Sequence, residues 1–235
     1  MPKVRLKKTA QVEPEIHSKP FDFTYDITWR IFRVMSEFTE GIEFISRLER
    51  PVTFFGSART KPQNRYYKDA VLLAKRLGRK GFTIVTGGGP GIMEAGNKGA
   101  FEAKASSVGL NIELKREQRT NKYVTKSIGF DYFFSRKAML TTSAQAYVFF
   151  PGGFGTLDEL FSVLTLIETK KIEPRPIVLF GSEYWRKLNY FIKENMLKHH
   201  KMISEQDLHL YSIVDTVKDA EHIIFNSKRR LYTFM

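Results

Sequence analysis

Cysteine is absent from the 235 residues of the chain. The protein can therefore form neither a disulfide nor a thiolate metal site, and its composition suits a reducing compartment, so we expect a cytoplasmic protein. The five histidines do not replace cysteine as metal ligands, because they lie in the N-terminal segment or the C-terminal third without the spacing of a metal site. We predict no metal and no cofactor.

Long apolar runs are also missing. A membrane-spanning helix needs about 18 or more consecutive apolar residues, and no stretch of the chain approaches that length. The segment 1–20 is basic but has no apolar core. We expect neither a secretory signal nor a membrane partner.

Acidic residues are outnumbered by basic ones. Against 38 Lys and Arg there are 25 Asp and Glu, which leaves a net charge of +13. Such a surplus favours an anionic partner, namely nucleic acid, phospholipid or a phosphorylated small molecule, or simply solubilises the surface. The chain lacks a nucleic-acid motif and any interleaving of aromatic and basic residues, so we expect no nucleic-acid partner.

Strand-like and helix-like segments alternate along most of the chain, which predicts an α/β fold. We expect a Rossmann-like, doubly wound parallel sheet with helices on both faces. Helical spacing of apolar residues over 25–50 predicts extra helices before the first strand. The expected domain spans 25–225, between a basic tail over 1–24 and a C-terminal tail over 226–235. Strands are expected at 52–55, 82–85, 107–112, 129–134, 146–150 and 177–180, and a last helix at 183–197.

The stretch VTGGGPGIMEAG, residues 85–96, follows a predicted strand and leads into a predicted helix, and four of the seven residues over 87–93 are glycine. It does not fit the dinucleotide fingerprint G-x-G-x-x-G, and it lacks the Lys-Ser/Thr pair of a triphosphate-binding loop. A glycine turn that leads into a helix still presents free backbone N–H groups at the positive end of the helix dipole. The stretch is therefore either an anion site or a tight turn that binds nothing.

A second glycine turn, FFPGGFGTLDEL, occupies residues 149–160. Thr156 fits either an N-cap or a hydroxyl donor to phosphate, and Glu159 lies at capping-box spacing from it. In a parallel sheet, both turns lie at the carboxyl ends of strands, together with Ser57 and Arg59 after the first strand. Their convergence on one crevice predicts a phosphorylated ligand.

The stretches GGGPGIMEAG, SRKAML and PGGFGTLDEL together resemble the LOG (LONELY GUY) family, formerly mislabelled lysine decarboxylases. The resemblance covers about 52–180 and is of a bacterial type, since GIMEA and Asp158-Glu159 replace the plant pattern. It implies a Rossmann-like homodimer. It also implies hydrolysis of the N-glycosidic bond of a cytokinin riboside monophosphate or AMP, which yields free base and ribose 5-phosphate.

Carried over by position, the resemblance makes Arg136 and Glu159 catalytic, with Lys137 beside the arginine. The phosphate-binding positions that it implies are Gly88, Gly89, Gly91, Gly152, Gly153, Gly155 and Thr156. Glu159 would stabilise an oxocarbenium-like centre and activate water, whereas Arg136, which holds its proton, would orient the substrate and Glu159.

Three further positions depend on the residues alone. Ser57 is a candidate phosphate contact. Met93 either lines a base pocket or packs in the core. Glu94 either reaches a ribose hydroxyl or complements the dipole of its helix.

Apolar residues occupy more than one face of the segment 157–167, so this helix is either buried centrally or packed against a second subunit. We expect a homodimer. The alternative to hydrolysis is a protein of the same fold that carries a nucleotide or the molybdenum cofactor without cleaving it. Such a carrier needs the glycine turns but not the pair Arg136 and Glu159.

Overall fold

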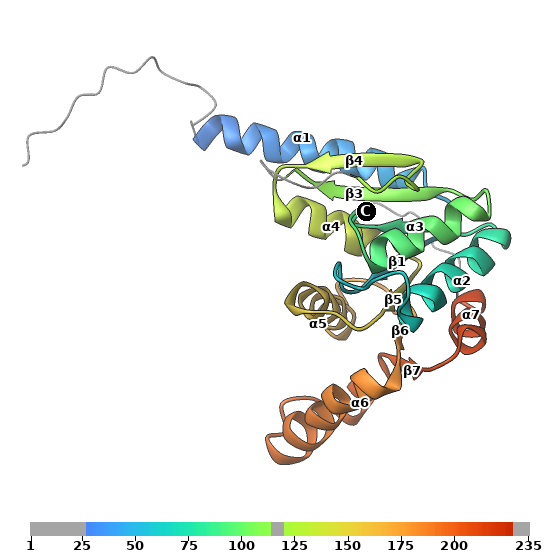
Figure 1. Ribbon diagram of the computed structural model, residues 1–235. Coiled ribbons are helices and arrows are strands. Elements are labelled where there is room, and N and C mark those ends of the chain that lie inside the picture. The colour runs from blue at the N-terminus through green and yellow to red at the C-terminus, as the bar shows by residue number, and fades with distance from the viewer. Residues whose placement is uncertain (1–26, 114–119, 228–235) are drawn as a thin grey trace, which may run out of the picture.

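A seven-stranded parallel sheet forms the centre of the protein in the computed structural model, which describes residues 27–113 and 120–227 (Figure 1). The strand order is β4-β3-β2-β1-β5-β6-β7, and every pair of neighbours is parallel. The predicted doubly wound α/β fold is therefore confirmed. The strands are β1 Pro51–Phe55, β2 Thr83–Thr86, β3 Ser107–Ile112, β4 Lys126–Phe130, β5 Ala146–Phe149, β6 Ile177–Phe180 and β7 Ser212–Val214.

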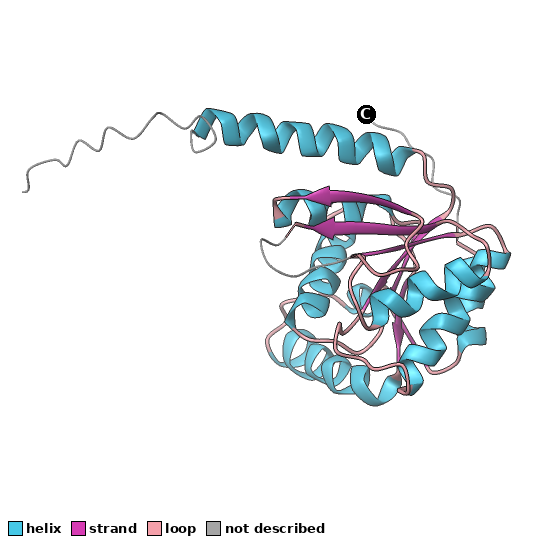
Figure 2. Ribbon diagram, turned by 45° about the horizontal axis from the view of Figure 1, so that its top comes forward, coloured by secondary structure: helices cyan, strands magenta, loops and turns pink. Residues whose placement is uncertain are grey.

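Helices cover both faces of this sheet (Figure 2). One face packs against α2, α3 and α7, and the other against α1, α4, α5 and α6. The helices are α1 Ile27–Ser46, α2 Arg65–Arg79, α3 Ile92–Glu102, α4 Phe133–Ser143, α5 Phe154–Glu168, α6 Ser182–Phe191 and α7 Val217–Phe225. A π-helical turn, η2 Ile192–His199, continues α6, and a short 3₁₀ helix, η3 Glu205–His209, follows it.

Alternating side chains of the central strands form two separate cores. Phe54 and Val148 point into the core beneath α2 and α3, whereas Phe55 and Phe149 stack in the core beneath α4 and α5. Because both faces of these strands are buried, their sequences are almost continuously apolar, as expected for a parallel sheet.

The direction of winding reverses between β1 and β5. After β1 the chain moves outward through β2 and β3 to β4, and then returns to β5 on the other side of β1. Loops at the carboxyl ends of neighbouring strands diverge at such a reversal and leave a crevice between them. This topology places the loops after β1, β2 and β5 around one crevice.

The sequence prediction lacked the last strand and the last helix, and it misplaced the strand at one edge of the sheet. β7 and α7 were not predicted, and the strand expected at 129–134 is β4 at Lys126–Phe130, so that α4 already begins at Phe133. β4 is an edge strand with mostly exposed residues, and β7 has three residues, so neither carries a strong apolar signal. The predicted tail 1–24 and residues 228–235 lie outside the described residues.

The N-terminal helix α1 is anchored at only one end. Gly41 and Ile45 in its C-terminal half are buried against α4 and β4, whereas the N-terminal half extends beyond the edge of the sheet (Figures 1 and 2). Ile27 is 73% exposed and Met35 is 58% exposed. α1 is one continuous helix, within the range of one or two that the spacing predicted.

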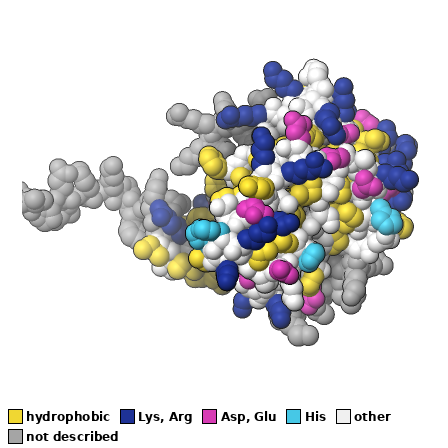
Figure 3. Space-filling model, turned by 90° about the horizontal axis from the view of Figure 1, so that it is seen from below, with side chains coloured by type: hydrophobic (Ala, Val, Ile, Leu, Met, Phe, Trp, Pro, Cys, Tyr) yellow, Lys and Arg dark blue, Asp and Glu magenta, His cyan; other side chains and the backbone are white. Residues whose placement is uncertain are grey.

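Basic and acidic side chains are mixed on the surface. Figure 3 shows Lys and Arg spread over one face among carboxylates and apolar side chains, rather than in a single continuous strip. Within the described residues, no helix combines the length and the apolar character needed to cross a membrane.

Candidate active site

Three loops meet at the carboxyl edge of the sheet, and backbone hydrogen bonds join them. The N–H of Ser57 after β1 donates to the carbonyl of Pro151 after β5, at 3.1 Å. The carbonyl of Ser57 accepts from the N–H of Ile92 at the start of α3, also at 3.1 Å. Ser57 therefore links the two glycine turns through its backbone, and the expected convergence of the three loops is present.

The first glycine turn is compact because other groups occupy the space that side chains would need. Gly88 and Gly91 have φ of 73° and 69°, a region that favours glycine. A Cβ at Gly88 would lie 1.7 Å from Asn111 Oδ1, and one at Gly91 would lie 2.3 Å from the Ser57 carbonyl oxygen. The N–H of Gly88 already donates to Thr86 Oγ1. The N–H groups of Gly89 and Gly91 are buried and have no partner among the described residues, so they are the unpaired donors of this turn.

The second glycine turn opens toward solvent. A Cβ on Gly153 or Gly155 would meet nothing within 4 Å. Gly153 is the N-cap of α5, so of the two alternatives for Thr156 the N-cap is wrong, and with it the Thr156–Glu159 capping box. Thr156 is the third helical residue, and its buried side chain fills the space beside Gly152. The N-terminus of α5, with the N–H groups of Gly153 and Gly155 unpartnered in the described residues, faces open space.

Arg136 lies in the first turn of α4, and its guanidinium is held at the carboxyl ends of two strands. Its Nε donates to the carbonyl of Leu110 at 2.7 Å, and its Nη2 donates to the carbonyl of Gly87 at 3.3 Å. Burial lowers the pKa of Arg136, and the nearby charge of Glu159 opposes that shift. An arginine keeps its proton at neutral pH. Two of its five N–H donors are used here, so the guanidinium retains donors for a ligand.

Glu159, on α5, is half-buried, and its Oε2 is a buried atom without a hydrogen-bond partner in the described part of the chain. Burial raises the pKa of this carboxyl to about 7; Asp158 adds to the rise, whereas Lys137 and Arg136 lower the value. A buried polar atom without a partner is uncommon in native proteins and often marks a site that a ligand or water completes. Glu159 is therefore a carboxylate that changes protonation state near neutral pH at the mouth of the crevice.

Of the other predicted contacts on α3, Met93 lies beside Arg136, whereas Glu94 is bonded to another helix. The sulfur of Met93 and the guanidinium of Arg136 both approach Gly87, so Met93 lies at the crevice rather than in the core. Glu94 Oε1 accepts a hydrogen bond from the hydroxyl of Tyr67 at 2.7 Å, so this carboxylate already has a partner on α2. Burial and that bond raise the pKa of Tyr67. Within the described residues, no group of three or more acidic or histidine side chains is placed to hold a metal.

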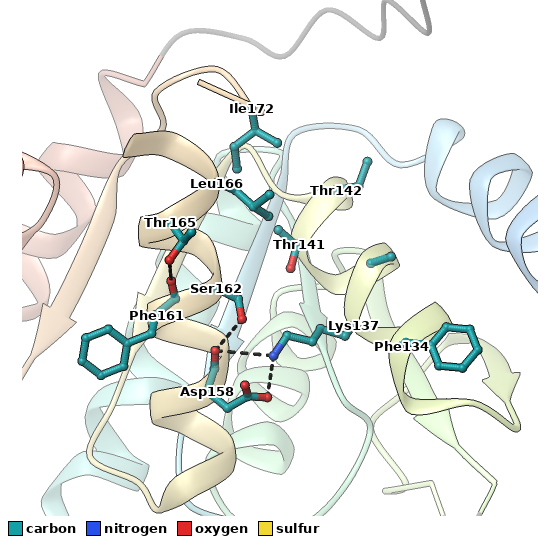
Figure 4. A pocket seen from close by; sticks show the side chains of 11 residues that line it. Phe134, Lys137, Thr141, Thr142, Asp158, Phe161, Ser162, Thr165, Leu166 and Ile172 are labelled. Atoms are coloured by element: carbon teal, nitrogen blue, oxygen red, sulfur yellow. Dashed lines mark hydrogen bonds and ion pairs between the residues drawn. The ribbon is translucent and has the colours of Figure 1, made fainter. Parts of the chain in front are cut away.

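The side chain of Lys137 reaches from α4 to α5. Its Nζ forms an ion pair with Asp158 across the gap between α4 and α5 (Figure 4). The two helices border a groove of about 670 Å³. Its walls include Phe134, Thr141, Phe161 and Leu166. The charge of Lys137 lowers the pKa of Glu159, and its ion pair with Asp158 joins the two helices that carry the predicted catalytic pair.

Sequence reasoning missed the polar network beneath the first glycine turn. Asn97 on α3 is fully buried; its Oδ1 accepts from Thr86 Oγ1 at 2.6 Å and from Asn121 Nδ2 at 2.9 Å. The Nδ2 of Asn121 also lies 3.1 Å and 3.0 Å from the carbonyls of Gly88 and Gly89. An asparagine on the apolar face of a helix was the available signal for Asn97. Asn121 follows a polar loop and carries no such signal.

A family model described as "Possible lysine decarboxylase" matches residues 93–224. The probable cytokinin riboside 5′-monophosphate phosphoribohydrolase LOGL3 of Oryza sativa subsp. japonica is 28% identical over 63% of this chain and 71% of its own length. The cytokinin riboside 5′-monophosphate phosphoribohydrolase LOG of the same organism is 31% identical over 58% of this chain and 56% of its own. The pyrimidine/purine nucleotide 5′-monophosphate nucleosidase of Escherichia coli K12 is 28% identical, and the match covers 58% of this chain and 34% of that protein.

Solved structures share the fold at lower identity. The molybdenum cofactor carrier protein of Chlamydomonas reinhardtii superposes with a TM-score of 0.59 at 21% identity, over 75% of this chain and 96% of that one. The molybdenum cofactor binding protein of Rippkaea orientalis gives a TM-score of 0.54 at 19% identity, over 74% and 93%. These likenesses establish a common fold.

Replacing Asn97 tests the support of the first glycine turn. We expect Asn97→Ala to destabilise the protein by about 2–3 kcal/mol, because the buried hydroxyl of Thr86 loses its acceptor, and Ser107 and Asn121 each lose one of their hydrogen bonds. Urea denaturation measures the change. Ser106→Ala is the matched control: its Oγ is buried and has no partner in the part of the chain that the structure describes, so removal of the hydroxyl should cost little. Equal stability of the two variants would contradict the role of Asn97.

Proposed function

The chain belongs to the LOG family, and on that basis we propose that it hydrolyses the N-glycosidic bond of a purine nucleoside 5′-monophosphate. The observation that carries the proposal is the pair formed by Arg136 and Glu159 beside two glycine turns, of which the second is open to solvent. A carboxylate with a raised pKa and an unpartnered oxygen suits an acid–base role. The products are the free base and ribose 5-phosphate. AMP and cytokinin riboside monophosphates are the two proposed substrates.

The proposed reaction divides the work between the two ends of the substrate. The 5′-phosphate binds at the free N–H groups of Gly89 and Gly91 and at the N-terminus of α5, where the helix dipole favours an anion. Ionised Glu159 stabilises the positive charge that develops at C1′ and accepts a proton from the attacking water. The hydroxyl of that water becomes the new C1′ hydroxyl, and its proton ends on the departing base. Arg136 stays charged and orients the ribose and Glu159.

Substrate supply and electrostatics suit a cytoplasmic enzyme, since nucleoside monophosphates are intracellular anions and the chain carries a charge of +13. The proposal requires no metal and no cofactor. The second candidate is a carrier that binds a nucleotide or the molybdenum cofactor without cleaving it. The common fold with carrier proteins is compatible with both, and the presence of the pair Arg136 and Glu159 favours hydrolysis.

Incubation with AMP and with isopentenyladenosine monophosphate, followed by chromatography, tests the reaction. We expect free adenine or free cytokinin, and we expect Glu159→Gln to lower kcat at least about 100-fold while nucleotide affinity stays within severalfold. The amide keeps the shape of the side chain but cannot accept a proton from water. Tight binding without release of base from a panel of nucleotides would favour the carrier. Undiminished turnover by Glu159→Gln would remove Glu159 from its role.

The pH dependence follows from the raised pKa of Glu159. Since the reaction needs the ionised carboxylate, kcat/KM should rise with pH through about 7 and then level off. At pH 5.5 we expect about 30-fold lower kcat/KM than on the plateau, from the ionised fraction alone. The substrate phosphate also titrates near pH 6. The pH profile alone therefore cannot separate the two groups, and NMR of ¹³C-labelled glutamate in the ligand-free protein is needed to measure Glu159 by itself. We expect a pKa of about 7 for Glu159; a value near the ordinary 4.5 would contradict the assignment.

The same shift has a consequence for stability. The folded state binds the proton of Glu159 more tightly than the unfolded state does. The stability that this protonated carboxyl contributes is therefore fully present below pH 4.5 and is lost as pH rises through about 7. Glu159→Gln removes that loss, so the variant should gain stability relative to the wild type as pH rises through this window.

We also propose that the protein works as a homodimer through α4 and α5. α5 buries Leu160 and Val163 against the sheet, and its outer face still carries Phe161 beside the groove, opposite Phe134 of α4. A second copy on this surface would cover the groove and exclude water from the side of Glu159. Large exposed apolar surface of this kind marks interaction sites.

Sedimentation velocity tests the dimer. We expect the wild type at twice the chain mass and Phe161→Glu as a monomer, because a carboxylate in an apolar interface loses its hydration. Leu72→Glu, at an exposed position on α2 across the sheet, is the matched control and should remain dimeric. A monomeric wild type, or a dimeric Phe161→Glu, would exclude this interface.

A further inference from the structure

Helix α1 reaches the start of α4 through the carboxylate of Glu37. Its Oε1 accepts the N–H of Asp131 at 2.7 Å, and its Oε2 accepts the hydroxyl of Ser135. One turn earlier on α1, Arg33 forms an ion pair with Asp131. The two helices are distant in sequence, so these contacts are set by the fold.

The start of α4 has no cap of its own. Tyr132 occupies the N-cap position without a side-chain hydrogen bond, and the first turn contains no acidic residue. A negative charge at a helix N-terminus is stabilising, because it complements the unpaired N–H groups and the dipole. Two carboxylates lie at this end of α4: that of Asp131, just before the helix, and that of Glu37 on α1. The two bonds of Glu37 go to the N–H of Asp131 and to the hydroxyl of Ser135 in the first turn, so they tie the start of α4 to α1.

The segment that Glu37 holds carries the residues next to the proposed chemistry. Ser135 is fully buried and bound to Glu37. The next residue, Arg136, binds the carbonyls of Leu110 and Gly87, and Lys137 pairs with Asp158. Three consecutive residues thus connect α1, the strand ends and α5. A shift of Ser135 would displace Arg136 and Lys137 together.

Close packing fixes where Glu37 lies along α4. One turn after Glu37, Gly41 lies against α4 and β4, where a Cβ would be 2.8 Å from Met139 Cγ and 3.2 Å from Phe130. The absence of a side chain at Gly41 lets the helices approach to this distance. α1 therefore holds Glu37 in register with Asp131 and Ser135.

We propose that Glu37 is a positioning residue for the reaction: through Asp131 and Ser135 it sets the place of Arg136 and Lys137 at the crevice. α1 is then part of the active-site architecture rather than an appended segment. The proposal rests on the proposed function. It concerns a residue that does not touch the substrate, so its effect passes through α4.

Kinetics of Glu37→Ala against Glu40→Gln test the proposal. Glu40 lies on the same helix, is exposed and bonds only with Ser36 of α1 among the described residues, so it is the matched control. We expect Glu37→Ala to lower kcat for AMP about 10- to 100-fold, since a small misplacement of catalytic groups has effects of this size. KM should change less than threefold, because the phosphate-binding turns are untouched. Glu40→Gln should match the wild type, and Glu37→Gln should recover most of kcat, because its amide again bridges Asp131 and Ser135.

The pKa of Glu159 gives a readout that a loss of stability alone would not move. The charged groups that face this carboxyl are Lys137, Asp158 and Arg136, and the two cations lower its pKa. If α4 shifts outward in Glu37→Ala, their effect weakens and the pKa of Glu159 should rise above about 7. NMR titration of the ligand-free proteins, below their melting temperatures, measures it without turnover. Ser135→Ala, which keeps the Asp131 contact, should give a smaller change of the same sign.

Failure of the proposed function and failure of the role of Glu37 give different results. A wild type that releases base from no nucleotide removes the proposed function, but the titration still tests whether Glu37 positions Arg136 and Lys137. A wild type that cleaves AMP while folded Glu37→Ala keeps both kcat and the pKa of Glu159 overturns the inference and leaves the function intact.

Discussion

The backbone of Ser57 is the contact on which the crevice depends. Its N–H and carbonyl join the turn after β5 to the start of α3, so a loop after β1 holds the two glycine turns in one place. These bonds require the turns to approach as bare backbone: the Gly91 Cα lies against the Ser57 carbonyl, where a Cβ would come within 2.3 Å. The reversal of the sheet between β1 and β5 brings these loops together at the carboxyl edge, where open α/β sheets bind their ligands.

The two helices that enter this crevice differ in the charged groups that they bring to it. α5 presents an N-terminus whose Gly153 and Gly155 N–H groups have no partner among the described residues, and one and a half turns later it holds the half-buried Glu159 in surroundings that favour the neutral acid. α4 brings two cations whose charges restore part of the tendency of Glu159 to ionise. The opposing effects leave the pKa of Glu159 at about 7, so that near neutral pH the carboxyl can both accept and return a proton. α1 enters the same balance through Glu37, since it holds the segment from which both cations project.

Particular residues show how far prediction from the sequence reached. The apolar runs of β1, β5 and β6 and the glycine turns after β2 and β5 predicted the parallel sheet and the place of the crevice, because burial on both faces leaves a strong local pattern. β4 and β7 were misplaced or missed, since an exposed edge strand and a three-residue strand lack that pattern. The sequence left the N-cap open as one of two alternatives for Thr156, because Thr-x-x-Glu has capping-box spacing wherever it falls, and only the backbone shows that α5 begins at Phe154.

The sequence by itself determined the α/β architecture, the two glycine turns and the resemblance that directed attention to Arg136 and Glu159. Each of these is local, since it depends on residue types at short spacing along the chain. Only the tertiary structure decided that Gly88 N–H is occupied by Thr86, that Lys137 is paired with Asp158, and that Asn97 and Asn121 support the first turn. It also decided that Glu37 meets Ser135, 98 positions away. Such contacts depend on how helices pack across the sheet, and spacing along the chain carries no record of them.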